Sequence, residues 1–449
     1  MLFREKAYRK FHRRMLAISD QYIKIFLKYS LPILVTGIIS RAFPLLDFIY
    51  SIVPVLLAIY ILLALTSIKR RNVNFKLLAV FFLFPVYSLL TSLWSVYPVI
   101  TLQRSLYLIL LYAGILSAVY LYQKYLPEKG IEFLIPANIL VLIISLISLV
   151  LAIPENSWTG GNGLGFMGFA GHQNTLASAV LFTLPGIIYL WIRKRDIESK
   201  LNNNNSHSWS LSHFLKEKKN HYFFFFLITT NVLLITLTYS RAVILAIGIG
   251  LLVYIILTKS YKTLLAGFLI VLAIFIMFLN FQSVNQSINQ ILSKHGWDVL
   301  ATRTLLWQSS FEAAKLGGVN GLGYGVSSPD IILPEGTGSY YKDNIYIREK
   351  GNSTLALIEE TGVIGLIFFI MPLIFVFIRR NDTRNQIPDD KNLFGIKHPE
   401  SSILIASLAA FILHAQFEAW WVGPGSIQLP MFLIYIGLFH STSINLNEE

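Results

Sequence analysis

The sequence contains no cysteine, and charged residues make up only 14% of its 449 positions. The absence of cysteine excludes disulfide bridges, thiolate metal sites and cysteine nucleophiles. Low charge, together with 55% hydrophobic residues, argues against a soluble enzyme of this length. A mean hydropathy of +0.60 instead indicates a polytopic membrane protein.

Several chemical signatures are also missing. The glycine-rich stretch Gly317–Gly325 lacks the Lys-Ser/Thr pair of a phosphate-binding Walker loop, and it does not follow a strand as a dinucleotide-binding loop would. The Asp-x-Asp pattern of many metal-dependent sugar transferases is absent, and no outer histidine or carboxylate pair has metal-ligand spacing. We therefore expect no nucleotide site, no metal and no cofactor.

Apolar runs long enough to cross a hydrocarbon core occur along the chain, and we predict an all-α polytopic membrane protein. The runs number about twelve and are separated by short polar segments. They lie near 29–43, 44–67, 76–94, 102–123, 133–153, 174–192, 222–239, 241–258, 262–280, 354–378, 402–418 and 426–440.

The positive charges supply the orientation. The formal charge of +13 falls in short clusters between apolar runs, which indicates membrane topology and argues against a nucleic-acid partner. With the basic N-terminal segment inside, most of the 37 Lys and Arg residues lie in inner loops, so we expect both termini in the cytoplasm. The predicted organisation is 1–280 with nine spans, 281–353 as one large, partly helical extracytoplasmic loop, and 354–449 with three spans.

The unusual polar residues gather on the outer side. The loop 281–353 combines an amphipathic helix pattern from Leu300 to Ala314 with glycine turns. A second outer segment ends in His172-Gln173-Asn174, and a third holds Glu418 beside Trp420 and Trp421. This distribution predicts an active face outside the cytoplasm.

Three arginines are candidates for anion binding, because a planar guanidinium suits phosphate oxygens. Arg303 stands four residues before Trp307 on the expected loop helix, and its ordinary alternative is a solvated surface residue. Arg241 and Arg104 stand at or near the outer ends of spans, where an arginine also reaches the lipid headgroups without any catalytic role.

Glu418, Glu360 and His172 are the candidate proton acceptors. A carboxylate at a span end usually needs a partner, so Glu418 fits a structural ion pair as well as a catalytic role. Glu360, after Glu359, also fits an acid favoured at a helix N-terminus. His172 fits a simple helix-entry residue. Trp and Tyr faces suit sugar rings, although they are also ordinary interfacial residues.

Motifs in a set order resemble the O-antigen ligase and O-antigen polymerase family of bacterial envelope membrane proteins. They comprise Trp94-Ser95 with Pro98 and Arg104, Gly171 to Asn174 with Ala177, Ser240-Arg241-Ala242, Arg303 and Trp307 with Gly321 to Gly325, and Asn352-Ser353 with Leu355, Glu360, Gly362 and Gly365. One position departs from the ligase-like members. They carry His-Asn where the outer loop returns to the membrane, and this chain has Gly351-Asn352.

The resemblance implies a glycosyltransferase in the bacterial inner membrane whose donor is an undecaprenyl-pyrophosphate-linked glycan and whose acceptor is a sugar hydroxyl of a second glycan. Gly351 favours polymerisation of repeat units for O-antigen, capsule or exopolysaccharide. Transfer of finished glycan to lipid A core or to protein by a ligase remains the alternative. A polysaccharide or lipid transporter and an assembly protein are alternatives of other classes. Partners would include a chain-length regulator or a flippase.

The family chemistry assigns roles to the candidates. Arg303 and Arg241 would stabilise the diphosphate leaving group, and Glu418, Glu360 or His172 would accept the proton of the sugar hydroxyl, with Glu418 ranked first. The substrate-binding candidates are the polar and aromatic residues of the outer segments, namely Arg104, Asn174, Trp307, Tyr324, Asn352, Trp420 and Trp421.

Overall fold

The computed structural model describes residues 2–67, 75–153, 159–160, 163–204, 211–258, 301–331, 339–342, 345–384 and 399–444. Near several segment ends only the backbone is described, and the affected stretches are 2–19, 75–78, 159–160, 163–164, 195–204, 211–221, 301–303, 339–342, 376–384, 399–400 and 441–444.

The described backbone is mostly helical. This agrees with its long apolar runs, because a helix satisfies all backbone hydrogen bonds within one segment in lipid. Its helices of four turns or more follow in chain order: α1 (Leu2–Ser40), α3 (Ile52–Ser67), α4 (Phe75–Leu90), α5 (Pro98–Tyr125), α6 (Ile135–Leu151), α7 (Gln173–Asn204), α8 (Leu211–Thr238), α9 (Arg241–Thr258), α12 (Ala301–Gly317), α13 (Ser353–Arg384), α14 (Pro399–His414) and α15 (Gln428–Ile444). The short α2 (Asp47–Tyr50) connects α1 to α3.

Seven described segments are long and apolar enough to cross a membrane: Asp20–Ser40, Pro44–Ser67, Pro98–Tyr125, Glu132–Leu151, Gln173–Lys194, Arg241–Thr258 and Ser353–Phe375. Shorter apolar helices are Ala79–Leu93, Tyr222–Thr238, Ser401–His414 and Gln428–His440. Together they coincide with all the predicted runs except 262–280, which lies outside the described residues. The helical membrane class is confirmed, and the count of twelve stays a prediction.

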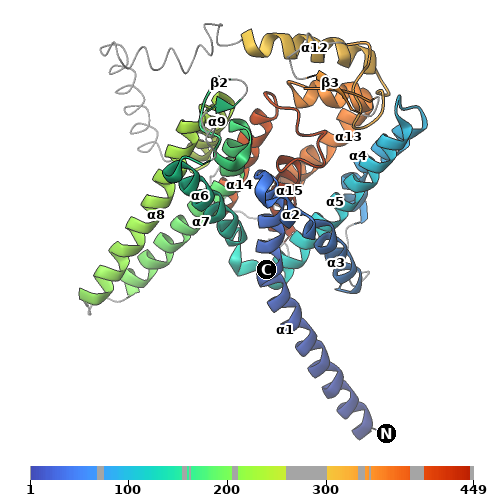
Figure 1. The fold of residues 1–449 in the computed structure, drawn as a ribbon. Coiled ribbons are helices and arrows are strands. Elements are labelled where there is room, and N and C mark those ends of the chain that lie inside the picture. Colours follow the sequence, from blue (N-terminus) through green and yellow to red (C-terminus); the bar gives the residue numbers. More distant parts are fainter. Residues whose placement is uncertain are drawn as a thin grey trace.

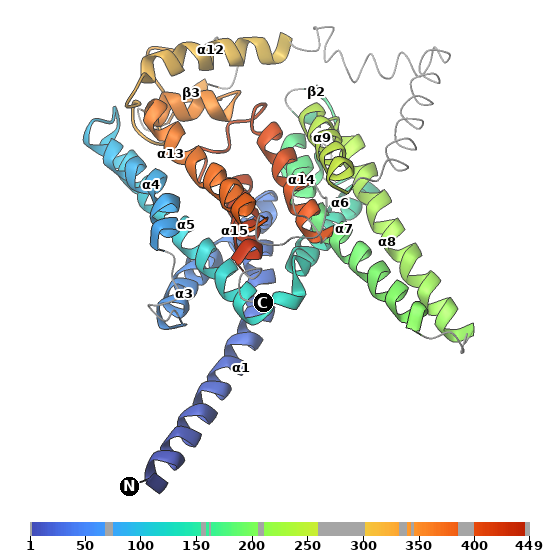
Figure 2. The same cartoon turned by 180° about the vertical axis from the view of Figure 1, so that it is seen from behind.

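The helices form two groups with a central set between them. Figures 1 and 2 show α3, α4, α5 and α13 on one side, α6 to α9 on the other, and α1, α14 and α15 between them. α12 lies across one end of the molecule, beyond α13 and the hairpin that contains β3 (Figure 1). The residues that precede α5 and α13 are therefore held on one group of helices, and those that precede α7 on the other.

Close packing and buried polar contacts fix these groups. α3 and α5 approach so closely at Gly114 that a Cβ there would stand 2.5 Å from Leu57 Cβ. Asn138 of α6 donates to Thr183 Oγ1 of α7 at 2.9 Å and to Asn231 Oδ1 of α8 at 2.9 Å, and Asn231 donates back at 3.1 Å. In lipid, helices associate mainly through close packing at small residues and through hydrogen bonds between polar side chains of neighbouring helices. Burying apolar surface contributes little there, because the lipid tails are equally apolar.

Two short pairs of strands accompany the helices, and the all-α class stands. β3 (Ser339–Lys342) and β4 (Ile345–Arg348) pair as an antiparallel hairpin, and β1 (Thr159–Gly160) pairs with β2 (Gly163–Leu164). α12 occupies the stretch where the sequence predicts an amphipathic helix and packs against α13. The described part of the loop 281–353 thus contains a helix, α12, followed by a β-hairpin, β3–β4.

Residues 317–328, here named the glycine strap, run from α12 back along the start of α13. Leu322 N donates to Glu359 O at 2.9 Å and Gly323 N donates to Glu360 O at 2.9 Å. The glycines are required by this close approach, because a Cβ at Gly321 would stand 2.3 Å from Glu360 O. Gly362, at φ +69°, interrupts the helical geometry of α13 on the facing side.

Candidate functional site

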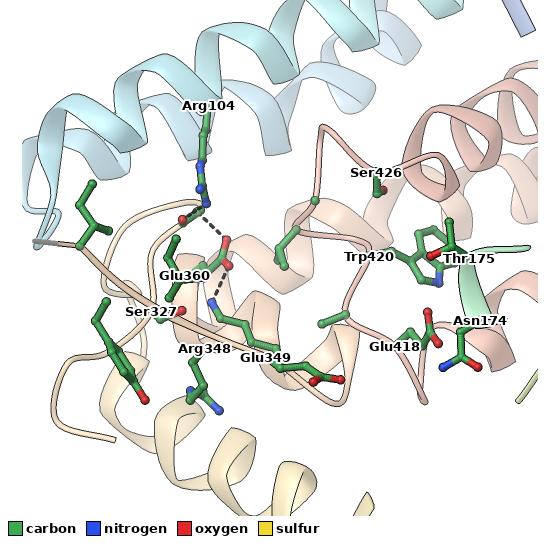
Figure 3. Close-up of a pocket in the computed structure, with 18 of the residues that line it drawn as sticks. Arg104, Asn174, Thr175, Ser327, Arg348, Glu349, Glu360, Glu418, Trp420 and Ser426 are labelled. Atoms are coloured by element: carbon green, nitrogen blue, oxygen red, sulfur yellow. Dashed lines mark hydrogen bonds and ion pairs between the residues drawn. The ribbon is translucent and has the colours of Figure 1, made fainter. Parts of the chain in front are cut away.

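A cavity of about 550 Å³ lies where the two helix groups meet the glycine strap and β4. Its wall combines side chains from α5, from the approach to and first turn of α7, from the strap, from β4 and the residues after it, from α13, and from the segment after α14. Figure 3 shows labelled residues of these elements around one space. Distant parts of the sequence therefore share this site.

A buried ion network forms the floor near α13. Arg348 Nη2 lies 2.7 Å from Glu359 Oε2, and both side chains are 0% exposed. Lys350 Nζ lies 3.3 Å from the same oxygen and 2.6 Å from Glu360 Oε1. Two cations therefore neutralise two carboxylates, which is the condition under which charges are tolerated in such a buried place.

The same carboxylates hold the glycine strap. Glu360 Oε2 accepts a hydrogen bond from Gly325 N at 2.5 Å, and Glu359 Oε1 accepts one from Ser328 N at 2.9 Å. Lys350 Nζ donates to Val326 O at 2.8 Å. Because the network bonds both to itself and to the strap backbone, its main effect is to fix the position of the strap.

Arg104 of α5 reaches the strap from the opposite side. Its Nη1 donates to Gly325 O, and Figure 3 shows the side chain descending from α5 toward Glu360. Gly325 has φ +79°, and a Cβ there would stand 2.3 Å from Arg104 Cδ. No described carboxylate lies within ion-pair distance of Arg104. The guanidinium is thus positioned at the cavity with its charge unneutralised by protein.

The start of α7 supplies His172, Asn174 and Thr175 to the cavity. His172 Nδ1 accepts a hydrogen bond from Asn174 N at 3.2 Å. An accepting Nδ1 assigns the neutral ring the tautomer with its proton on Nε2. In this tautomer the ring carries its N–H on Nε2, so His172 is a donor there and not a proton acceptor.

The segment after α14 supplies Glu418 and Trp420. Trp420 Nε1 donates to His414 Nδ1 at 3.1 Å, and its ring stands edge-on to Phe182 with centroids 5.6 Å apart. Ser353 Oγ donates to the backbone oxygen of Glu418 at 2.7 Å. The segment is therefore anchored at several points, so that Glu418 and Trp420 are held in the cavity wall.

Six of the predicted site residues line this one cavity: Arg104, His172, Asn174, Glu360, Glu418 and Trp420. Four other predicted site residues lie outside the cavity wall and contribute to packing or to helix capping. Asn352 caps α13 by accepting from Leu355 N at 2.9 Å, and Trp307 Nε1 donates to Gly351 O at 3.1 Å. Tyr324 and Trp421 are buried in the aromatic core.

The two leading arginine candidates have different positions. Arg241 is the first residue of α9, is half-buried and does not line the cavity. Arg303 lies in the first turn of α12, and its side chain is outside the described residues. Their joint role stays a prediction.

Sequence reasoning missed Arg348, Glu349 and Lys350, which all line the cavity. Glu349 is exposed, and Figure 3 shows its side chain extending toward the segment after α14, where Glu418 lies beside Asn174. Three consecutive charged residues directly after the apolar stretch Ile345-Tyr346-Ile347 were an available signal, because charged side chains that end up buried need partners and so mark an ion network.

The described residues contain no cluster of three or more metal-ligating side chains. The cavity wall includes guanidinium, ammonium, carboxylate, amide, imidazole, hydroxyl and indole groups. Guanidinium and ammonium groups are hydrogen-bond donors to anionic oxygens.

Comparison with protein families gives one match. A family model described as O-antigen ligase matches residues 223–370, and no curated protein matches the chain. The family resemblance is therefore confirmed over this range. It includes α9, α12, the glycine strap, β4 and the first half of α13, whereas Arg104, His172 and Glu418 lie outside it.

The family match implies processing of glycans of the O-antigen type in a membrane, with lipid-linked glycans as substrates. The apolar helices agree with this setting. The cavity is consequently walled on one side by the family-matched region and on the other by α5, α7 and the segment after α14.

Proposed function

We propose that the protein is a membrane glycosyltransferase that polymerises undecaprenyl-pyrophosphate-linked repeat units on the outer face of the bacterial inner membrane, with both termini in the cytoplasm. The observation that carries the proposal is the single cavity that gathers Arg104, His172, Glu418 and Trp420 beside the family-matched region. Cations, a carboxylate and an indole around one space suit a substrate that joins a sugar to a diphosphate.

The reaction is a displacement at the anomeric carbon of the donor. The acceptor hydroxyl oxygen forms the new bond to that carbon, the bond from carbon to diphosphate oxygen breaks, and undecaprenyl diphosphate leaves with the electron pair. The hydroxyl proton passes to a protein carboxylate and then to water. Negative charge grows on the leaving group, so cations placed near it contribute most to the rate.

Glu418 is the preferred proton acceptor. Both carboxylate oxygens of Glu360 already accept from Lys350 Nζ and Gly325 N, and its side chain is 3% exposed. His172 presents a donor in the tautomer assigned above. Glu418 instead belongs to the cavity wall opposite the ion network, within reach of a sugar bound against Trp420.

The position of Gly351 supports a polymerase over a ligase of the resembled type. A Cβ at Gly351 would stand 2.8 Å from Leu306 Cβ and 3.1 Å from Trp307 Cδ1. A histidine therefore has no room there unless α12 moves. The description of the matching family model keeps ligation as the second candidate function.

The test uses a strain that lacks the chromosomal copy and carries Arg241→Ala or Arg303→Ala. Loss of one donor to a developing charge lowers the rate on the order of 100- to 1,000-fold, so the surface glycan should shorten to single repeats on a gel. Arg193→Ala is the matched control, because Arg193 pairs with Glu132 at 2.5 Å near the other end of α7. Full-length glycan with both variants contradicts the leaving-group role, and long lipid-linked polymer in the deletion strain indicates a ligase.

A further inference from the structure

A second cavity, of about 480 Å³, adjoins the first. Arg41 lines it from the end of α1, Gln103, Arg104 and Tyr107 line it from α5, and the turn Val422–Ser426 closes it. Arg104 and part of the same turn also line the first cavity. A ligand in the second cavity would therefore stand beside the site described above.

The second cavity carries positive charge and no carboxylate in its wall. No described carboxylate lies within ion-pair distance of Arg41 or Arg104. Two guanidinium groups that share a space without protein anions leave a net charge of about +2 there. An anion with two phosphate groups matches that charge and offers oxygens for planar, two-point hydrogen bonding.

Both guanidinium groups are held in place. The Arg41 guanidinium lies over the Tyr50 ring at 4.5 Å, and Tyr50 Oη shares a hydrogen bond with Tyr107 Oη. Arg104 donates to Gly325 O. Positioned cations bind an anion with less loss of side-chain freedom than solvated ones, which favours a specific site.

Each guanidinium lies beside a glycine. Arg41 Nη2 is in van der Waals range of a Cβ placed at Gly425, at 3.4 Å, whereas a Cβ at Gly325 would collide with Arg104 Cδ at 2.3 Å. Headgroup contact alone explains an exposed arginine at the end of a span. It does not explain why a second arginine, packed on a second glycine, faces the same space.

Apolar side chains beside the cavity suit a lipid-linked ligand. Exposed apolar residues lie within a few positions in sequence of the lining residues Arg41, Gln103 and Tyr107, in η1 (Pro44–Leu46), α2 and α5: Leu45 is 70% exposed, Phe48 73%, Val99 66% and Leu106 52%. An anionic group in the cavity can thus be attached to a hydrocarbon chain that lies along these side chains in the bilayer.

We propose that the Arg41–Arg104 cavity binds the diphosphate of a second polyprenyl-linked glycan, the acceptor. This inference rests on the proposed polymerase function. The donor diphosphate would lie near Arg241 and Arg303, the acceptor diphosphate would lie between Arg41 and Arg104, and the two glycans would meet in the first cavity beside Glu418. A ligase that transfers glycan to lipid A core or protein has no need of a second polyprenyl diphosphate.

The test is the binding stoichiometry of radiolabelled undecaprenyl diphosphate to the full chain in phosphatidylcholine nanodiscs. We expect two equivalents per chain for the native sequence and one for Arg41→Ala, with the affinity of the lost site falling tenfold or more. Arg41 is exposed and makes a ring contact, so its removal should leave the fold intact. Arg193→Ala should keep two equivalents, since Arg193 lies far along α7 and pairs with Glu132.

Competition separates the possible sources of the anion. A tenfold excess of phosphatidylglycerol should leave both equivalents bound, and inorganic pyrophosphate should compete weakly because it lacks the hydrocarbon chain. Displacement of one equivalent by phosphatidylglycerol would overturn the proposal and assign Arg41 to headgroup contact.

The outcomes also separate this proposal from the proposed function. One equivalent for both the native chain and Arg41→Ala, with glycan elongation intact, overturns the second site and leaves the polymerase standing. Unchanged elongation in Arg241→Ala and Arg303→Ala overturns the leaving-group role, whatever the stoichiometry.

Discussion

Two groups of charged side chains border the cavities, and they differ in how their charge is balanced. Arg348 and Lys350 are neutralised by Glu359 and Glu360 at 2.6 to 3.3 Å and are nearly excluded from water. Arg41 and Arg104 lie outside ion-pair distance of every described carboxylate and are exposed. The first group has its electrostatic partners within the protein, and the second has room for a partner from outside.

We infer from this difference that the two groups of charged side chains have different functions. A balanced, buried network fixes geometry, because losing one member leaves a charge without compensation. An unbalanced pair at a cavity raises the local concentration and affinity of anions. The glycine strap connects them, since Gly325 N donates to Glu360 and Gly325 O accepts from Arg104.

The largest effect is expected from breaking the balanced group with Glu359→Leu. The change leaves buried Arg348 without its carboxylate, which costs about 3–5 kcal/mol of folding stability. The measurement is the fraction of folded protein during denaturation in detergent, followed by circular dichroism. The double variant Arg348→Met with Glu359→Leu should recover most of the loss, because neither charge then remains unpaired.

The matched control is Glu312→Gln in the exposed pair with Lys315. That pair has an N–O distance of 2.9 Å and side chains that are 57% and 48% exposed. Its loss should cost less than about 1 kcal/mol. Equal destabilisation by both single variants would show that burial of the network has no special consequence.

An intermediate effect is expected from Gly325→Ala, which acts on the connection between the groups. The new Cβ would collide with Arg104 Cδ and force the guanidinium to move. A misplaced binding group of this kind lowers the rate on the order of 100-fold, measured as glycan elongation in membranes.

Gly318→Ala is the comparison for that prediction. Gly318 also has positive φ, at +54°, and the nearest atom to its new Cβ is Lys315 O at 3.8 Å. Both substitutions carry backbone strain of roughly 1–2 kcal/mol, whereas only Gly325→Ala displaces Arg104. Similar elongation rates in the two variants would argue that the position of Arg104 is unimportant.

The smallest effect is expected from Tyr324→Phe. Tyr324 belongs to the glycine strap, which connects the two groups of charged side chains. Burial raises the pKa of the Tyr324 phenol well above its usual value, so it stays neutral at physiological pH. Its Oη has no partner among the described residues. Removing the hydroxyl should leave the rate of elongation and its pH profile unchanged. It should not lower the free energy of unfolding, because the hydroxyl makes no hydrogen bond within the described part of the chain that could be lost. A clear fall in elongation would restore Tyr324 as a sugar-binding residue.

Hydropathy predicted the positions of the described apolar helices, because a membrane core imposes a length and a composition that single runs display. It missed the β3–β4 hairpin and the path of the strap. The strap pairs with α13 through Leu322 to Glu359 and Gly323 to Glu360, contacts between residues 37 positions apart in sequence. Such pairing leaves no periodic signal in either segment.

The candidate site was predicted in part for a similar reason. Glu418, His172 and Arg104 stood out because polar residues are rare beside apolar runs. Asn352, Tyr324 and Trp421 stood out equally, yet the structure uses them as a helix cap and as core. Sequence identifies unusual residues, whereas only packing decides which of them face the same space.

The most direct measurement supplies purified protein in nanodiscs with one substrate only, a single repeat unit linked to undecaprenyl diphosphate. The account predicts a ladder of longer lipid-linked glycans and release of one undecaprenyl diphosphate for each bond formed. A substrate that stays unchanged until lipid A core or a protein acceptor is added would contradict it.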